Sequence, residues 1–333
     1  MNLQKGLRLE RGSKADWDEV LAAHPGATAF HRYEFLECVA TLLRCTFEPL
    51  VIMQGTDRAG VAPLVVRKVG PLCTLNWMPF PYLGPLTSES LLPAVVSLLA
   101  TEGTVRGAIH HQQGFADLVP DGVAGKFNPG TDLTFVVPLD GRSDEALLAA
   151  MTRNGRWEIS RARRDGVQVY PAEHADFLLM DRWSQAIYAR QGLPPKYPAG
   201  AYERLFDTMG GRAGSHFHAA RLDGKTIAVN MGFSIGNRSF DWQMATDPAH
   251  RKACPQALLL WSHLTAARDR GDTYFDLGGA PTDGIAVYKR NFGAVERHYT
   301  VLSRHSVIGR AKYWAASVRP ARGQSRQVEP SSA

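Results

Sequence analysis

The sequence predicts an α/β (α+β) protein with two domains, each a mixed β-sheet flanked by helices. Apolar residues recur at helical spacing in some segments and in short strand-like runs in others. The order of these segments begins again after residue 140, and 333 residues exceed the usual size of one domain. A hydrophobic content of 44% with 21% charged residues is typical of a globular protein with a sizeable core.

The first half alternates predicted helices with predicted strands. Asp57 and Gly60 mark the turn of a hairpin, and the proline-rich segment 76–86 is too broken for a central strand. In chain order the predicted elements are helices at 16–24 and 32–43, strands at 47–53 and 60–69, a helix at 89–103, and strands at 105–110 and 132–139.

The second half repeats this plan around a three-stranded meander. Glycines end the first two helices, and the Asp223-Gly224 and Gly236-Asn237 pairs form the turns of the meander. The predicted elements are helices at 144–166, 175–192 and 198–211, strands at 215–222, 226–235 and 238–245, a helix at 254–271, a strand at 273–279, a short helix that carries Lys289, and a strand at 296–304.

These patterns predict an N-terminal domain at 1–140, a C-terminal domain at 141–303, and a basic, disordered tail at 304–333. The tail carries six Lys/Arg against Glu329, which accounts for +5 of the formal charge of +6, so the body is nearly neutral. No window has the roughly 20 apolar residues that a membrane helix needs. We therefore expect a cytoplasmic monomer without a membrane span.

The sequence gives weak support to three other kinds of chemistry. Four scattered cysteines have no metal-ligand spacing, so we expect free thiols and no metal site. "GFSIG" fits the G-x-S-x-G pattern of a serine hydrolase, but a strand follows Ser234 where that site needs a helix. His216 and His218 share a strand face, and we expect a structural or solvated pair.

The segment "FDLGGAPTDGIAVYKRNFG" joins a strand, a glycine pair and a cationic helix. A meander that feeds a helix through a polar loop resembles the GNAT superfamily of acyl-CoA N-acyltransferases, whose R/Q-x-x-G-x-G/A loop binds pyrophosphate at the helix N-terminus. The chain has "RKACPQA" there. Cys254 and Gln256 replace the small residues and Pro255 removes an amide, which argues against acetyl-CoA.

The segments "HPGATAFHRYEFLECV", "FPYLGPL", "RARRDGV", "FDLGG" and "YKRNFG" together resemble the Fem-type branch of that superfamily over about residues 15–299. The family's F-K-x-x-F-G signature matches Tyr288-Lys289-Arg290-Asn291-Phe292-Gly293, with Tyr for the first Phe. The resemblance implies two GNAT-like domains and transfer of an amino acid from aminoacyl-tRNA to an amine, on a peptidoglycan precursor or a natural-product intermediate of antibiotic biosynthesis. Glu37, Cys38 and Val39 stand where wall-precursor enzymes carry Lys, which argues against a UDP-linked acceptor.

Aminolysis of an ester passes through an oxyanion, which a fixed ammonium stabilises, so Lys289 is the predicted catalytic residue. Asp241 is a weaker candidate for the base. The glycines would let the substrate approach the strand end, because they lack side chains. With the residues that the resemblance implies, the predicted acceptor-binding residues are Arg190, Tyr197, Phe240, Trp242, Tyr288, Phe292, Gly278 and Gly279.

The helix around "RNGRWEISRARRDG" has five arginines against two acids, and it either binds the phosphates of tRNA or is an ordinary solvated face. The predicted tRNA-binding residues are Arg156, Arg161, Arg163, Arg164, Arg251 and Lys252.

Aminoacyl-tRNA would be a co-substrate, and no cofactor is expected. Two alternatives stay open: an N-acyltransferase that uses acyl-CoA or an acyl carrier, and a catalytically silent binding module.

Overall fold

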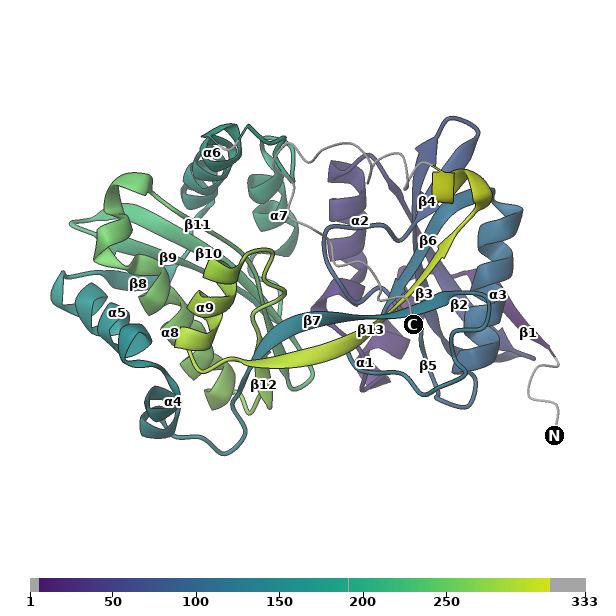
Figure 1. The fold of residues 1–333 in the computed structure, drawn as a ribbon, viewed down its shortest axis with the longest axis horizontal. Coiled ribbons are helices and arrows are strands. Elements are labelled where there is room, and N and C mark those ends of the chain that lie inside the picture. The colour runs from purple at the N-terminus through teal and green to yellow at the C-terminus, as the bar shows by residue number, and fades with distance from the viewer. Residues whose placement is uncertain (1–5, 191, 312–333) are drawn as a thin grey trace. The chain divides into compact units, whose positions relative to one another are not determined.

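The computed structural model describes residues 6–190 and 192–311, which form two compact units (Figure 1). Unit 1 contains the described residues up to Asp132 and from His298 onward, and unit 2 contains Leu133–Arg297. Strands β7 (Asn128–Pro138) and β13 (Val295–His305) contribute residues to both units. The chain thus crosses between the units twice, whereas the sequence analysis placed one boundary after residue 140.

Unit 1 contains a mixed sheet in the order β1-β2-β3-β4-β6-β13, in which β4 and β6 run parallel. The predicted helices and the hairpin are present, while β1 and β4 were not predicted. The bounds are β1 (Leu7–Arg11), α1 (Lys14–Ala23), the 3-10 turn η1 (Ala29–His31), α2 (Tyr33–Leu42), β2 (Thr46–Gln54), β3 (Asp57–Val69), β4 (Leu72–Leu75), β5 (Leu86–Thr87), α3 (Leu92–Val105) and β6 (Ala108–Gly114).

The proline-rich segment after β4 is irregular, as the sequence predicted, and within it only Leu86–Thr87 form a short strand. Asn76 has a φ of 55° and Tyr82 a φ of 65°, which no extended strand allows. The Asn76 side chain stabilises this turn: its Oδ1 accepts from the Val65 amide at 2.7 Å, and its Nδ2 donates to the Pro63 carbonyl at 2.9 Å.

The strands of unit 2 have the order β7-β12-β11-β10-β9-β8, with β11 and β12 parallel. The meander and both of its predicted turns are confirmed, and β8 is an addition. The bounds are α4 (Asp144–Ala150), α5 (Arg153–Arg164), β8 (Gln168–Pro171), α6 (His174–Arg190), α7 (Ala201–Met209), β9 (Ser215–Leu222), β10 (Lys225–Ile235), β11 (Arg238–Thr246), the 3-10 turn η2 (Pro248–Ala253), α8 (Pro255–Asp269), β12 (Tyr274–Asp276) and α9 (Asp283–Asn291).

The single helix predicted at 144–166 is wrong, because the chain breaks at Met151 into α4 and α5. Met151 has an extended backbone, with ψ at 150°, and the Thr152 hydroxyl caps α5 by accepting from the Gly155 amide at 3.3 Å. A threonine at this position favours a new helix start over continuation. The break turns α5 so that it packs against α8 and α9.

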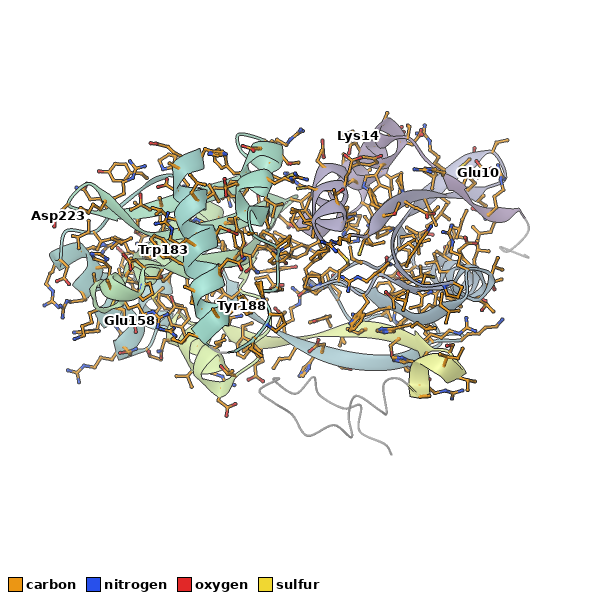
Figure 2. The ribbon with its side chains drawn as sticks, turned by 90° about the horizontal axis from the view of Figure 1, so that it is seen from above. Glu10, Lys14, Glu158, Trp183, Tyr188 and Asp223 are labelled. Carbon is orange, nitrogen blue, oxygen red and sulfur yellow. The ribbon has the colours of Figure 1, made fainter. Side chains whose placement is uncertain are left out.

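Helices cover both faces of the unit 2 sheet, with α6 and α7 on one face and α5, α8 and α9 on the other (Figure 1). Trp183 and Tyr188 both project from α6 (Figure 2), and Trp183 is buried. The apolar core on the α8 face includes Leu259, Leu264 and Phe275. Because helices cover both faces of these strands, a functional site can form at an end of the strands.

The start of the predicted tail is part of unit 1. Arg304 and His305 end β13 by pairing with β6, and Arg304 donates to the Thr104 hydroxyl at 2.8 Å. These contacts explain why 304–311 are ordered where disorder was expected, while 312–333 lie outside the described residues. Among the described helices, none has the length and apolar content that crossing a membrane requires.

Candidate active site

The candidate site of unit 2 lies where the parallel strands β11 and β12 cease to pair. Their pairing covers Arg238–Phe240 and Tyr274–Asp276, after which β12 ends while β11 continues to Thr246. At the same level the pairing of β10 with β11 shifts register between Met231 and Gly232. A bulge of this kind bends a strand and turns its side chains, and it lies at the level where β12 ends.

Lys289 occupies the end of β12. Its ammonium donates to three consecutive carbonyl oxygens, at 2.5 Å to Leu277, 2.8 Å to Gly278 and 2.6 Å to Gly279. The ammonium also lies 5.8 Å from the centre of the Phe135 ring, and the residue is only 8% exposed. All three N–H groups of the ammonium are thus used by the strand end.

The glycine pair differs from its predicted role in one respect. Gly278 has a φ of +74°, a left-handed conformation that favours glycine, and this turns its carbonyl toward Lys289. Gly279 is exposed, and a Cβ there would lie 3.2 Å from the Leu133 carbonyl oxygen. Gly278 therefore has a backbone requirement of its own, and the prediction that the pair admits the substrate stays a prediction.

Two carboxylates surround the ammonium, and both interact with its charge. Burial raises the pKa of Asp241 to about 6, against the opposing effects of Asn230 and the Lys289 charge. Asp276 is 3% exposed, and its Oδ1 accepts from the Thr134 hydroxyl at 2.5 Å and from the Gly278 amide at 2.7 Å. The sequence analysis did not single out Asp276, although it stands inside the quoted "FDLGG" motif.

The same environment lowers the pKa of Lys289. Burial moves it to about 8, while Asp241 and Asp276 oppose the shift. Near neutral pH the site therefore holds a protonated amine beside a carboxylate that accepts a proton readily. A proton acceptor and a positive charge within one small site are what transfer of an acyl group to an amine requires.

Helix α9 holds Lys289 in place through its neighbours in the signature. The Thr282 hydroxyl caps the helix by accepting from the Ile285 amide, and Phe292 is fully buried at its end, 5.1 Å from the Tyr288 ring. Burial raises the pKa of Tyr288, whose hydroxyl is shielded from solvent. These positions give Phe292 and Tyr288 a packing role, and their contact with an acceptor stays a prediction.

The remaining predicted acceptor residues belong to β11 and the α6 side of the sheet. Tyr197 and Trp242 lie together with ring centres 5.4 Å apart, and Phe240 is buried. The Tyr197 hydroxyl is buried, and no described residue bonds to it. Arg190 is exposed at the end of α6. Asp241 interacts with the Lys289 charge on α9, whereas Trp242 contacts Tyr197, so the two side chains point to opposite faces of the sheet.

The six predicted tRNA-binding cations differ in their availability. Arg156 donates to the carbonyl oxygens of Leu148 and Met151 and so caps α4, and Arg161 is held by Asp165 at 2.6 Å. Four of the cations are exposed and pair with no carboxylate in the part of the chain that the structure describes: Arg163, Arg164, Arg251 and Lys252. Arg163 lies 6.0 Å from the Trp261 ring on α8. Fewer of the six cations are therefore available to bind phosphates than the sequence analysis predicted.

The weakly supported chemistries find no site in the part of the chain that the structure describes. Ser234 lies within β10, as the strand reading predicted, and contacts His216 at 2.8 Å. His218 and the buried His263 are 2.7 Å apart, and burial lowers the pKa of both. The four cysteines are free, and no described group of acidic, His or Cys residues has the arrangement of a metal site.

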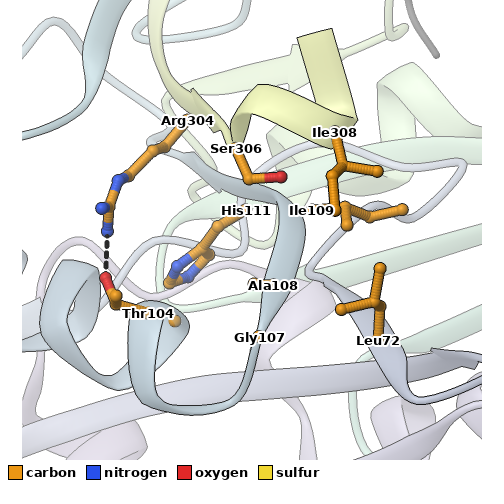
Figure 3. Close-up of a pocket in the computed structure, with 10 residues that line it drawn as sticks. Leu72, Thr104, Gly107, Ala108, Ile109, His111, Arg304, Ser306 and Ile308 are labelled. Atoms are coloured by element: carbon orange, nitrogen blue, oxygen red, sulfur yellow. Dashed lines mark hydrogen bonds between the residues drawn. The ribbon is translucent and has the colours of Figure 1, made fainter. Parts of the chain in front are cut away.

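A cavity of about 190 Å³ lies in unit 1, between α3, β6 and the segment after β13 (Figure 3). Its lining combines apolar residues and glycines with four polar side chains, those of Thr104, His111, Arg304 and Ser306. Burial lowers the pKa of His111 to about 3, which leaves that ring neutral. None of the predicted site residues lines this cavity.

The start of α8 departs from the form that binds pyrophosphate. Cys254 precedes the helix in a left-handed conformation with φ at 53°, and Pro255 occupies the first helical position without an amide proton. The Gln256 side chain donates to the Ala245 carbonyl at 2.9 Å and so spans the gap to β11. The loop offers fewer free amides to an anion than the sequence pattern of the superfamily would.

Residues 150–290 match the profile of the acetyltransferase (GNAT) domain. The fold is similar to that of FemX, with a TM-score of 0.70 and 15% identity over 88% of this chain and 96% of that one. It is also similar to the C-terminal domain of a putative lysylphosphatidylglycerol synthetase from Agrobacterium fabrum, with a TM-score of 0.61 and 12% identity over 93% and 98%. The fold is similar as well to that of L-PGS from Bacillus licheniformis, with a TM-score of 0.59 and 14% identity over 94% of this chain and 99% of that one.

No curated protein sequence matches the chain. The structural similarities establish the GNAT-like fold, and the matched domain supports an acyltransferase as the class of protein.

Proposed function

We propose that the protein is an aminoacyltransferase that moves an amino acid from aminoacyl-tRNA to the amine of a small-molecule or peptide acceptor. The observation that carries this proposal is the buried ammonium of Lys289 beside Asp241 at the open end of β12. The Fem-type signature around Lys289 and the similarity to FemX support the same chemistry. The similarity to the C-terminal domain of a putative lysylphosphatidylglycerol synthetase, whose name indicates a lysyl group in its product, gives further support.

In the proposed reaction, the acceptor amine attacks the ester carbonyl of the aminoacyl group. The new C–N bond forms, the C–O bond to the ribose breaks, and Asp241 takes the proton that the amine loses. That proton returns to the ribose oxygen as it leaves. Because Asp241 has a pKa of about 6, it is mostly ionised near neutral pH and is matched to this transfer.

Lys289 would stabilise the oxyanion of the tetrahedral intermediate. In the substrate-free structure its three N–H groups are donated to carbonyls, so one of them must turn from a carbonyl to the reacting oxygen. Gly279 is the exposed member of the three and is the carbonyl we expect to release it. Fixed charge at such a position stabilises the transition state more than the ground state.

An acyl-CoA-dependent N-acyltransferase is the second candidate, and the match to the acetyltransferase domain favours it. The arrangement at the start of α8 opposes it, because Pro255 lacks an amide and Cys254 stands where the pyrophosphate loop has a small residue.

A donor exchange separates these two functions. The protein is incubated with primary amines and either mixed charged tRNA or a panel of acyl-CoA thioesters, and products are detected by mass spectrometry. We expect amide product with charged tRNA and none with acyl-CoA, and formation about 10²- to 10³-fold slower with the Lys289→Met variant. Turnover with acyl-CoA alone would contradict the proposed donor.

A further inference from the structure

The outer face of α5 combines an exposed aromatic side chain with arginines. Trp157 is 48% exposed, although α5 is well packed on its other side. Arg153, Trp157, Arg161 and Arg164 follow the spacing i, i+4, i+8 and i+11, which places them on one face of the helix. No ring or hydrogen-bond contact to Trp157 occurs within the described residues 6–190 and 192–311.

The opposite face of α5 is buried and accounts for the packing of the helix. Gly155, Ile159 and Ala162 are the buried residues of α5. Gly155 fits so closely that a Cβ there would lie 2.2 Å from the Asn291 carbonyl oxygen. Trp157 therefore contributes little to the core, and its exposed ring is available to a ligand.

The N-terminal turn of α5, where Arg153 begins the basic face, contacts the helix that carries Lys289. The Thr152 hydroxyl donates to the Asn291 side chain at 2.9 Å, and Asn291 is two residues beyond Lys289. Arg153 and Arg164 are exposed, and neither pairs with a carboxylate among the described residues. A polyanion that extends from α9 past the N-terminal turn of α5 would meet Arg153 first, and Trp157 and Arg164 farther along the same helix.

We propose that Trp157 stacks against an unpaired base at the 3′ end of the donor tRNA, while Arg153 and Arg164 contact the adjoining phosphates. The inference rests on the proposed function. Aromatic platforms flanked by cations bind single-stranded nucleic acid in this way, because each base has a π-face and each phosphate a negative charge. Trp157 and the arginines then select the unpaired end over the duplex stem.

An anionic membrane surface is the other polyanion that a Trp-Arg face can bind. Insertion into a bilayer needs a broad apolar face, and the apolar face of α5 is buried against the rest of unit 2. One aromatic residue among arginines matches a single stacked base better than it matches an acyl-chain layer.

The test measures binding of a fluorescent RNA hairpin with four unpaired 3′ nucleotides and of the same hairpin with a blunt end. We expect Trp157→Ala to weaken binding of the overhang hairpin about tenfold and to leave the blunt hairpin unchanged, while Trp157→Phe retains most of the affinity. Trp77→Ala is the matched control, because Trp77 is 47% exposed but belongs to unit 1. It should change neither affinity.

The outcomes separate this inference from the proposed function. If wild-type protein binds the overhang hairpin and Trp157→Ala binds it equally well, the stacking role is wrong while the donor assignment stands. If the wild type binds neither hairpin, the donor assignment and the stacking role both fail. If Trp157→Ala instead loses binding to phosphatidylglycerol vesicles and keeps its RNA affinity, the face belongs to a membrane and the inference is overturned.

Discussion

The two units each contain a parallel strand pair after a helix, and the ends of these pairs differ in charge. In unit 1, β6 pairs in parallel with β4, and the chain that follows β6 contributes to an apolar cluster that includes Val123 and Phe127. In unit 2, β12 returns beside β11, and its end holds Lys289 between Asp241 and Asp276. The same strand arrangement thus supports packing in one unit and a charged site in the other.

The polar groups of unit 1 at this level are neutral and serve the backbone. Asn76 bonds to the Val65 amide and to two carbonyls, and His111 has a pKa of about 3. Burial of neutral, hydrogen-bonded groups costs little free energy, whereas burial of a charged group costs much. A protein therefore keeps a buried charge where the charge has a role. Among the described residues, the buried aspartates and the buried lysine all lie in unit 2, which supports the proposal that unit 2 carries the chemistry.

The largest expected effect comes from removing the positive charge in unit 2. Lys289→Met should lower kcat about 10²- to 10³-fold, because the oxyanion loses its charged donor. Single-turnover transfer from charged tRNA measures this loss. Circular dichroism must show a folded variant, and a rate equal to that of the wild type would remove Lys289 from the mechanism.

The second effect concerns the proposed base. Asp241→Asn should lower kcat at pH 7 about 10²-fold, since the amine then has no carboxylate to take its proton. The fold should persist, because Asn has the same shape and a buried uncharged group costs less than a buried carboxylate. Unchanged turnover would assign proton removal to the substrate or to water.

The reverse result is expected in unit 1. Asn76→Ala should reduce the free energy of unfolding by about 3 kcal/mol, because three hydrogen bonds are lost from a residue that is 3% exposed. The kcat of the folded fraction should not change. Urea titration and activity measured on the same preparation check both statements. A large loss of kcat would contradict the assignment of packing to unit 1 and of chemistry to unit 2.

The smallest effect is at the turn that holds the ammonium. Gly278→Ala should cost about 1–2 kcal/mol of stability, because φ at +74° is unfavourable for a residue with a Cβ. The added Cβ would lie 3.8 Å from the Lys289 nitrogen, so space is not the obstacle. A thermal melt measures the cost. The matched change Gly279→Ala should cost less, since Gly279 has no positive φ.

The sequence predicted the fold well where local signals were strong. The meander and its two turns follow from glycine and asparagine at the loops, and the glycine pair with Lys289 marks the end of β12. The break at Met151 was missed because the apolar spacing continues across it and only the Thr152 cap reveals it. The strands β1, β4 and β8 are short, and pairing with their neighbours stabilises them more than their own residues do.

The site was harder to predict because its members meet only in the folded chain. Asp276 stood in the motif, but the Thr134 hydroxyl and the Gly278 amide that hold its carboxylate become visible only in the structure. The cations of α5 were counted equally, although Arg156 and Arg161 have local partners. Spacing along a helix gives a face, and contacts decide which of its charges are available.

The pH dependence of kcat/KM for aminoacyl transfer tests most directly the claim that the charge pair of unit 2 performs the reaction. Activity needs ionised Asp241, so it should rise with pH through about 6, and it needs protonated Lys289, so it should fall through about 8. The acidic limb should be absent in Asp241→Asn, and the basic limb absent in Lys289→Met. A wild-type profile whose two limbs both persist in these variants would contradict the account.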